Sequence, residues 1–342
     1  SGILLLGGAI SAGLLVFHVA VVPLIFKYSK GFRRSLIFLN FIQWPPFVDF
    51  EEPEACGIEG GRNLSIEYES KVDNCRVKIG IWHILPKTVY GRLKGNFLKD
   101  DKEALKMLMD DELANTSTPI MLYCHGNSNS RAAHHRIELY KFFQEMEFHT
   151  IAFDYRGYGD STNLAPSEAG VVEDSLAVYA WLHDITSRTD RRPALFVWGH
   201  SLGTGISSHL LGNLAALSRR LRDCEPPPPP NGLILEAPFN NLADEVAKHP
   251  LSRVNTDCSH HIFYTTKVAN KVTARLMVSS HRSLWTFAIP AVSPTRCRPR
   301  KNLFTPFLEN SMLYCPRKIS VRYPSCISRI MRIGYSSFAI GK

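Results

Sequence analysis

A long apolar run opens the chain and predicts its first element. Residues 3–26 contain no Asp, Glu, Lys or Arg and are rich in Leu, Val, Ile and Gly. Crossing a bilayer takes about 20 mainly apolar residues, whereas the apolar core of a signal peptide is only about 7 to 15 residues long. The pattern therefore predicts a transmembrane helix over residues 3–26, followed by a juxtamembrane segment over residues 27–61.

Farther along the chain, short apolar runs alternate with helical patterns. Residues 64–68 and 76–84 alternate apolar and polar positions, which predicts two paired strands. Further strands are predicted where apolar runs end in polar or glycine-rich turns, over residues 120–124, 150–153, 195–198 and 233–235. Apolar residues spaced three and four apart predict helices over residues 132–146 and 170–183, and residues 99–112 predict a charged helix or loop. This alternation is typical of an α/β fold with a mostly parallel, doubly wound sheet.

Residues 253–342 differ from the rest of the chain in composition. They carry fifteen Lys and Arg residues but only two acidic ones, Asp257 and Glu309, and they hold four of the eight cysteines. We interpret this basic divergent tail as the product of an alternative exon, of a misassembled gene model or of a genuine extension, and favour the first two. The core over residues 62–252 is then incomplete, with an open sheet edge at residues 233–235.

The basic tail does not predict nucleic-acid binding. Its Lys and Arg residues are interleaved with Tyr314 and Tyr323, a combination that nucleic-acid-binding proteins also use. No nucleic-acid-binding fold signature accompanies the charge, and a membrane helix is predicted at the other end of the chain. We therefore expect no nucleic-acid partner.

Two signals for membrane orientation conflict. Four Lys and Arg residues lie within residues 27–34, and such cations favour the cytosolic side of a membrane. The glycosylation acceptor patterns Asn63-Leu64-Ser65 and Asn115-Thr116-Ser117 would instead place the body in the lumen of the secretory pathway, if either is used. The eight cysteines include no Cys-x-x-Cys pair, so no zinc ribbon or redox centre is predicted. In a lumenal setting Cys56 and Cys75 could form a disulfide or stay free.

The motif with the most chemical content follows the strand predicted at residues 195–198. Gly199-His200-Ser201-Leu202-Gly203 is the sequence form of a serine nucleophile on a sharp strand-to-helix turn. Glycines flank the serine because the helix must pass close to the strand and the serine backbone is strained there. We predict Ser201 as the nucleophile.

A serine nucleophile also needs donors for the oxyanion that forms when it attacks a carbonyl. The backbone N–H of Leu202, directly after the nucleophile, is one candidate. The second is the backbone N–H of Asn127, because His125-Gly126-Asn127 directly follows the strand predicted at residues 120–124 and has the His-Gly form seen in such loops.

Several motifs together carry a resemblance to a known family. They are His125-Gly126-Asn127, residues 153–161 (FDYRGYGDS), residues 198–205 (WGHSLGTG), residues 235–239 (LEAPF), and the shorter segments at residues 38–40, 46–49 and 80–83. With these motifs the chain resembles the α/β-hydrolase-domain lipases, and among them the single-pass membrane subfamily that hydrolyses lysophosphatidylserine and monoacylglycerol. The likeness runs from about residue 3 to about residue 252.

The resemblance implies an α/β-hydrolase fold and a carboxylic-ester hydrolase that acts on lysophospholipids and monoacylglycerols. It implies an endoplasmic reticulum membrane location with the catalytic domain in the lumen, in agreement with the sequons. Its partners would be lipid substrate and the bilayer, and it requires neither a metal nor an organic cofactor.

The resemblance also implies a catalytic acid and a histidine past residue 252, and neither motif is present there. The aspartate and the histidines after Asp244, which are Asp257, His249, His260, His261 and His281, do not follow a predicted strand. The one conceivable replacement is Asp244 with His260 or His261, so the triad acid and histidine are not identified. Because loss of the triad histidine lowers turnover by about a millionfold, we expect the chain as written to be nearly inactive. The alternative to an enzyme is a pseudo-hydrolase or truncated isoform that binds lipid without turnover.

Three other features have two interpretations each. His134 and His135 could line the mouth of the site and bind a headgroup phosphate, or cap a helix at the surface. Arg156 is interpreted as forming a structural network with Asp154 and Asp160, or otherwise as contacting the headgroup. The apolar and aromatic stretch over residues 36–47 suits either a membrane interface or packing against the core.

Overall fold

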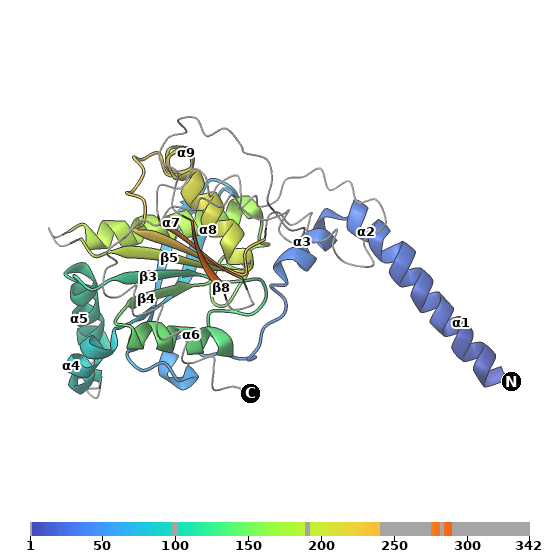
Figure 1. Cartoon of the computed structure of the whole chain (residues 1–342), viewed down its shortest axis with the longest axis horizontal. Coiled ribbons are helices and arrows are strands. Elements are labelled where there is room, and N and C mark those ends of the chain that lie inside the picture. The colour runs from blue at the N-terminus through green and yellow to red at the C-terminus, as the bar shows by residue number, and fades with distance from the viewer. Residues whose placement is uncertain (1, 98–101, 189–191, 240–274, 281–283, 289–342) are drawn as a thin grey trace, which may run out of the picture. The chain divides into compact units, whose positions relative to one another are not determined.

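A computed structural model describes residues 2–97, 102–188, 192–239, 275–280 and 284–288 (Figure 1). The chain divides into two compact units, Ser1–Pro290 and Ala291–Lys342, and all described residues belong to the first. The predicted tail over residues 253–342 therefore lies outside the described residues, except for two strands.

One mixed sheet organises the described residues. Its strands are β1 (Gly61–Ser70), β2 (Cys75–Ile84), β3 (Ile120–Cys124), β4 (His149–Phe153), β5 (Leu195–His200), β6 (Gly232–Glu236), β7 (Arg275–Ser280) and β8 (Leu284–Ala288). They lie side by side in the order β1-β2-β4-β3-β5-β6-β7-β8. The pairs from β4 to β7 are parallel, whereas β1, β2 and β8 join antiparallel. The mostly parallel sheet and the six strands predicted from the sequence are confirmed.

The edge of the sheet at β6 is covered, contrary to expectation. Strand β7 pairs with β6 in parallel, with Leu233 opposite Leu276, and β8 pairs antiparallel with β7. The prediction of an open edge at residues 233–235 is therefore wrong. Charge counting missed these strands because a strand needs only a short run of suitable residues, and Arg275–Ser280 supplies one inside the basic segment.

Helices cover both faces of the sheet (Figure 1). Helix α6 (His134–Glu145) lies on one face, and α7 (Glu168–Thr186) and α8 (Leu202–Gly212) lie on the other. The helices predicted over residues 132–146 and 170–183 are thus confirmed, and the charged segment contains α5 (Lys102–Ala114). Helix α5 packs on α4 (Lys87–Phe97) through Leu93 and Met109. The described residues also include the short helices η2 (Pro53–Cys56), α9 (Leu214–Leu217) and η3 (Ser218–Arg222).

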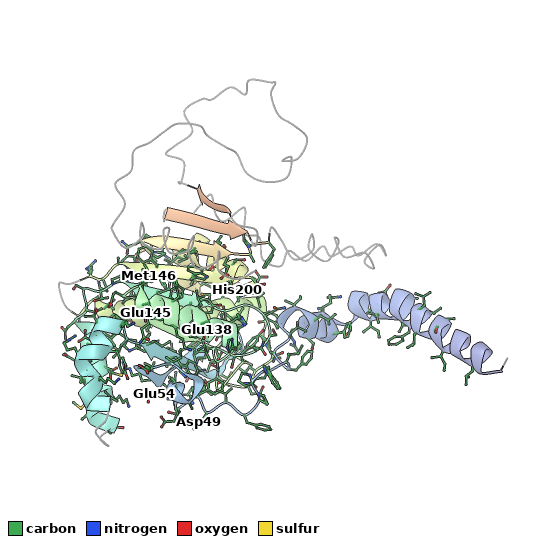
Figure 2. All side chains as sticks on the ribbon, turned by 60° about the horizontal axis from the view of Figure 1, so that its bottom comes forward. Asp49, Glu54, Glu138, Glu145, Met146 and His200 are labelled. Atoms are coloured by element: carbon green, nitrogen blue, oxygen red, sulfur yellow. The ribbon has the colours of Figure 1, made fainter. Side chains whose placement is uncertain are left out.

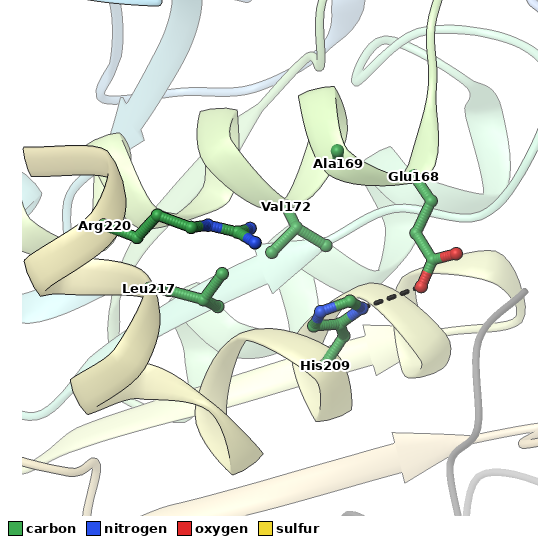
Figure 3. Close-up of a pocket in the computed structure, with 6 residues that line it drawn as sticks. All are labelled: Glu168, Ala169, Val172, His209, Leu217 and Arg220. Carbon is green, nitrogen blue, oxygen red and sulfur yellow. Dashed lines mark hydrogen bonds and ion pairs between the residues drawn. The ribbon is translucent and has the colours of Figure 1, made fainter. Parts of the chain in front are cut away.

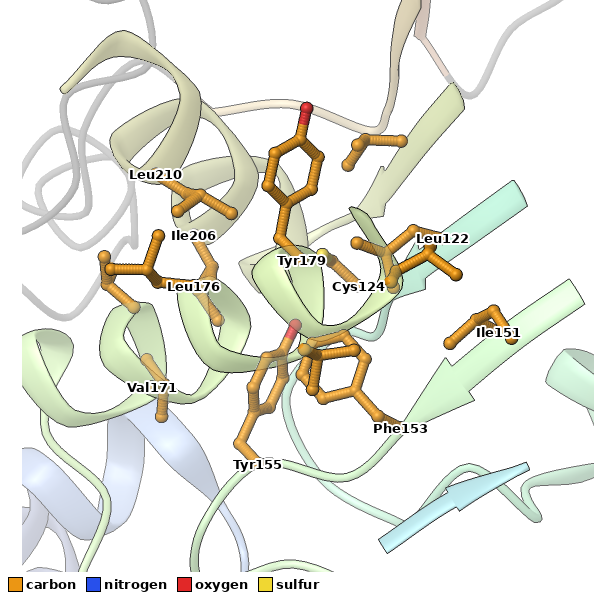
Figure 4. Packing of buried hydrophobic residues seen from close by; sticks show 14 of the residues in the cluster. Leu122, Cys124, Ile151, Phe153, Tyr155, Val171, Leu176, Tyr179, Ile206 and Leu210 are labelled. Carbon is orange, nitrogen blue, oxygen red and sulfur yellow. The ribbon is translucent and has the colours of Figure 1, made fainter. Parts of the chain in front are cut away.

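Strand alternation places two distinct apolar layers on the sheet. On the face of α7 and α8, strand residues such as Leu122, Cys124 and Phe153 pack against Leu176 and Ile206 (Figure 4). On the opposite face the packing is aromatic. Tyr123 meets Tyr140 at 5.4 Å between ring centroids, and Phe143 meets Trp198 at 5.1 Å. Successive strand side chains point to opposite faces, so each buried strand supplies both layers.

The apolar N-terminal run forms three helical segments, where one helix was predicted over residues 3–26. These are α1 (Gly2–Val16), the π-helical η1 (Phe17–Val21) and α2 (Val22–Tyr28). The Val22 N–H donates to the Phe17 carbonyl, a wider turn next to Pro23, which has no N–H to continue the α-helical ladder. Among the described residues, no helix combines the length and the apolar character that crossing a membrane requires. Helix α3 (Lys30–Phe38) follows.

The sequence left open whether Cys56 and Cys75 form a disulfide or stay free. Cys56 and Cys75 are free thiols, as are Cys124 and Cys224. Burial raises the pKa of the Cys124 thiol to about 12, so this side chain is a protonated, apolar part of the core.

A chain of buried polar groups connects β1, β2 and β4 inside the fold. The Arg62 guanidinium donates to His83 Nδ1 at 3.2 Å. Arginine can only donate, so His83 must carry its proton on Nε2, which lies 3.0 Å from His149 Nδ1. His149 then donates from Nε2 to the Thr116 hydroxyl at 3.0 Å. Every member has a partner only while both imidazoles are neutral.

Burial, and after it the Arg62 charge, lowers the pKa of both histidines: His83 well below its ordinary value, His149 to about 3. In the unfolded chain both protonate near about pH 6.5, so protons favour the unfolded state as the pH falls below that value. We predict that each histidine lowers the free energy of unfolding by about 1.4 kcal/mol per pH unit between about pH 6 and about pH 4.

Urea unfolding at several pH values checks this prediction. His149→Asn should remove one histidine's share of the slope below about pH 6. Above about pH 8, where both histidines are neutral in both states, the slopes of variant and wild type should coincide. Equal slopes in the acid range would contradict the assignment of His149 as a buried neutral group.

Candidate active site

The predicted nucleophile sits on a strained turn between β5 and α8. Ser201 is the N-cap of α8 and has φ 49° and ψ −115°, a conformation that residues other than glycine rarely adopt. Its N–H donates to the Glu236 carbonyl at 2.9 Å, so the neighbouring strand β6 holds the turn. Strain of this kind persists only where the surrounding structure fixes it.

The two glycines of the motif are required by close packing. A Cβ on Gly199 would lie 2.6 Å from the Gly203 carbonyl oxygen, and one on Gly203 would lie 2.0 Å from the Cys124 carbonyl oxygen. Helix α8 therefore passes against the ends of β5 and β3 at backbone distance. This contact lifts Ser201 to the carboxyl edge of the sheet.

The predicted oxyanion loop lies beside the predicted nucleophile. A Cβ on Gly126 would lie 3.4 Å from Ser201 Cβ and 3.0 Å from His200 Nδ1, so the loop touches the elbow directly. Leu202 is buried and opens α8, where the first backbone N–H groups have no acceptor within the helix. The structure thus brings Ser201, Leu202 and the loop with Asn127 together, as the sequence motifs require.

Arg136, which the sequence analysis did not single out, shapes this loop. Its side chain is buried and donates to four backbone carbonyls of the loop. These belong to Gly126, Asn127, Ser128 and Ser130, at 3.2, 3.5, 2.9 and 2.6 Å. Ser128 and Asn129 have φ of 57° and 54°. Because the guanidinium draws these carbonyls to one side, it fixes which way the loop's N–H groups can point.

His125 is a structural member of the loop. Its Nδ1 donates to the Gly126 carbonyl at 2.7 Å, and its ring packs on Tyr155 at 4.3 Å. Burial, followed by the charge of Arg136, lowers the pKa of His125 well below its ordinary value. A neutral, fully enclosed imidazole of this kind supports the loop and does not exchange protons at the nucleophile.

The acids at residues 154 and 160 pair with Arg131, and the sequence pairing with Arg156 is wrong. Arg131 Nη1 lies 2.6 Å from both Asp154 Oδ2 and Asp160 Oδ1, and its Nη2 donates to the Asn63 side chain at 2.8 Å. Local sequence spacing could not reveal Arg131, because tertiary packing brings it to these carboxylates.

Arg156 forms a structural network of its own, as expected, with partners from other elements. It contacts Asp174 at 2.9 Å, Glu173 at 2.8 Å, and Asp73. Burial alone would lower the pKa of Arg156, but the Asp174 carboxylate outweighs it and raises the pKa. Because the guanidinium is buried and fully engaged, it is not placed to bind a headgroup.

His134 and His135 open α6 without capping it, because the N-cap is Ala133 and no side chain makes the cap bond. The His135 ring lies 6.0 Å from the His200 ring, between centroids. Burial, followed by the Arg136 charge, lowers the pKa of His135 to about 4. His135 therefore lies next to the elbow and is uncharged at neutral pH. The alternative in which these histidines cap the helix is wrong.

Asp244, Asp257 and the late histidines all lie outside the described residues. Glu236, at the end of β6, is used otherwise, since its carboxylate accepts from the Trp198 indole at 2.9 Å. Among the described residues, no group of His, Cys, Asp or Glu is arranged to hold a metal ion.

A cavity of about 380 Å³ lies between α7 and the α8–η3 region (Figure 3). Glu168 and His209 meet across it at 2.7 Å, and Arg220 lines it. Its lining includes neither Ser201 nor Asn127. It is therefore separate from the candidate active site.

Comparison with known proteins confirms the family resemblance. Residues 119–224 match the family model described as the alpha/beta hydrolase fold. The lysophosphatidylserine lipase ABHD12 of Xenopus tropicalis is 38% identical over 239 residues, which are 70% of this chain and 54% of that protein. The rat protein of the same name is 39% identical over 238 residues, 70% of this chain and 52% of that protein.

A human relative, protein ABHD12B, is 33% identical over 219 residues, covering 64% of this chain and 52% of that protein. The chain thus spans about half the length of the curated relatives it matches. Among solved structures, an esterase from Pyrococcus furiosus is 17% identical, with a TM-score of 0.42 and coverage of 69% of this chain and 76% of that one. The fold assignment rests on strand order and the family model.

The close packing at the elbow predicts a steep penalty for one added methyl group. Gly203→Ala should lower the free energy of unfolding by about 3 kcal/mol, because the backbone of β3 cannot move away without disturbing the sheet. Gly91→Ala is the matched control: it lies in α4 with nothing within 4 Å of the added Cβ and should stabilise the protein by about 0.5–1 kcal/mol. Chemical denaturation measures both, and similar effects of the two changes would contradict the packing argument.

Proposed function

Because this chain carries an α/β-hydrolase domain and is similar to lysophosphatidylserine lipases, we propose that it is a serine hydrolase of lysophospholipid acyl esters. Lysophosphatidylserine is the first substrate of this proposal, and monoacylglycerol is the second. The observation that carries it is the strained Ser201 held against the Gly126 turn. That geometry serves acyl transfer, in which a hydroxyl and two backbone donors must face one carbonyl.

In the proposed reaction Ser201 attacks the acyl carbonyl and forms an acyl-enzyme. The backbone N–H groups of Leu202 and Asn127 hold the oxyanion, and water then releases the fatty acid. A histidine must accept the Ser201 proton and pass it to the leaving glycerol oxygen. His125 is not placed to do so, because its ring is completely buried and Nε2, the nitrogen that could accept a proton, faces Asp154 Oδ1 at 3.4 Å.

A non-catalytic lipid-binding protein is the second candidate. One feature of the sequence favours it: after Asp244 the only aspartate is Asp257, and no motif for the triad acid is present. A pseudo-hydrolase would keep the elbow and the oxyanion loop but lack an activated serine. Reactivity of Ser201 separates the two candidates.

We also propose that the protein works at the endoplasmic reticulum membrane with its body in the lumen. The sequons support this location, and they differ in access. Asn63 lies in β1 with its side-chain amide donating to Glu51 at 2.9 Å and its oxygen accepting from Arg131. Asn115 is exposed at the end of α5, so it is the sequon that a glycosyltransferase could reach.

The catalytic proposal predicts that a fluorophosphonate probe labels Ser201 in the full chain. Ser201→Ala should abolish labelling and lower ester hydrolysis by about a millionfold. Ser187→Ala, an exposed serine at the end of α7, is the control and should keep wild-type activity. An unlabelled Ser201 in a chain that still binds lysophosphatidylserine would support the non-catalytic candidate instead.

The location proposal predicts a glycan on Asn115 when the chain is expressed in secretory cells. Asn115→Gln should remove the mobility shift that a glycosidase also removes, whereas Asn63→Gln should leave the shift in place. A chain with no glycosidase-sensitive shift would count against the lumenal orientation.

A further inference from the structure

An uncharged loop of large apolar side chains projects from the described core. We call residues 41–47 (FIQWPPF) the aromatic loop. Phe47 is fully exposed at 102%, Trp44 is 71% exposed and Phe41 67%. Burying an aromatic side chain stabilises a protein by about 1.5–3 kcal/mol, and each of these three rings lacks that stabilisation in water. Adjacent exposed aromatic side chains mark an interaction surface.

The backbone of the aromatic loop is strained where its most exposed ring lies. Phe47 has φ 57°, a left-handed conformation that is an outlier for a bulky residue. Strain in a loop needs the surrounding structure to maintain it. The ring of Phe47 receives no burial inside the protein that could offset this strain.

The charges around the aromatic loop fit a phospholipid surface. Helix α3 precedes it with Lys30 and Arg34 exposed, where they can meet headgroup phosphates. Acidic residues follow the loop along the chain, and Asp49 and Glu54 lie away from His200 in Figure 2. Trp prefers the headgroup level of a bilayer, and Phe serves as an apolar anchor of segments that lie in the interface.

The aromatic loop is bonded to the loop that carries the predicted oxyanion donor. Asn129 N–H donates to the Ile42 carbonyl of the aromatic loop at 2.7 Å, and beside it Ser128 N–H donates to the carbonyl of Phe38, the last residue of α3, at 3.0 Å. In return, Trp44 N–H donates to the Asn129 side chain at 2.7 Å. A surface that binds the aromatic loop would therefore also position the backbone directly after Asn127.

We propose that the aromatic loop is an interfacial docking element that inserts Phe41, Trp44 and Phe47 into a phospholipid bilayer. This inference rests on the proposed function, because docking here sets the candidate active site at the headgroup level. A single-chain lipid then reaches Ser201 without leaving the bilayer completely. The backbone bonds to Ser128 and Asn129 keep the oxyanion loop in a fixed position relative to that surface.

The fluorescence of Trp44 reports directly on whether the aromatic loop enters a bilayer. The full chain is bound to vesicles of phosphatidylcholine and phosphatidylserine whose acyl chains carry bromine, which quenches tryptophan on contact. Subtracting the emission of Trp44→Phe isolates Trp44 from the other tryptophans. Bromolipid should remove about half or more of the Trp44 emission. The control is Met107→Trp in the Trp44→Phe background, since Met107 is equally exposed at 71% on α5 and should escape quenching.

A second measurement connects docking to turnover. In Phe41→Ser/Phe47→Ser, the ratio of turnover on vesicle-embedded lysophosphatidylserine to turnover on a water-soluble short-chain ester should fall about tenfold or more. Met107→Ser should keep the wild-type ratio. If the wild type hydrolyses neither ester, the proposed function fails, while Trp44 quenching still decides the docking.

Any one of three results would overturn the docking proposal. The first is Trp44 quenching no greater than that of the Met107→Trp control, and the second is an unchanged substrate ratio in the double variant. The third is shielding of Trp44 from aqueous acrylamide when no lipid is present, which would assign the aromatic loop to a protein contact, including a second copy of this chain.

Discussion

The approach of Gly203 to the Cys124 carbonyl is the contact on which the candidate site depends. A Cβ at that point would lie 2.0 Å from the oxygen, so helix α8 and strand β3 meet with no side chain between them. Cys124 is the last residue of β3, and the oxyanion loop starts at the next residue. One backbone contact therefore fixes the nucleophile and the loop that faces it, which explains why neither can shift independently.

Buried arginines give the loops around this contact their shape. Arg131, Arg136 and Arg156 are each almost completely enclosed, and burying a cation is unfavourable unless its donors are satisfied. Their acceptors differ: Arg131 and Arg156 donate to carboxylates, and Arg136 donates to backbone carbonyls of the oxyanion loop. Removing any acceptor would strand a buried charge, so these loops have one well-defined arrangement although they are not part of the sheet.

The sequence predicts those features that depend on neighbours along the chain. Strand alternation, the glycine-flanked serine and the His-Gly turn are local patterns, and the strands and the elbow follow from them. The role of Arg131 is not local, because its partners are Asp154 and Asn63, from distant parts of the chain. The acceptors of Arg136 are closer in sequence, but they are backbone carbonyls, which no side-chain motif marks. The same limit explains the wrong pairing of Arg156 with Asp154. Strands β7 and β8 were missed because overall charge obscured a short strand pattern.

The hydrogen bond from Ser201 N–H to the Glu236 carbonyl orders events during synthesis. Strand β6 follows the serine in sequence, after α8, α9 and η3. The strained serine has no partner for its N–H until Glu236 has left the ribosome and β6 has joined β5. The elbow is thus completed late, and a nascent chain that has already exposed the whole Gly199–Gly203 motif does not yet hold the serine in its final conformation.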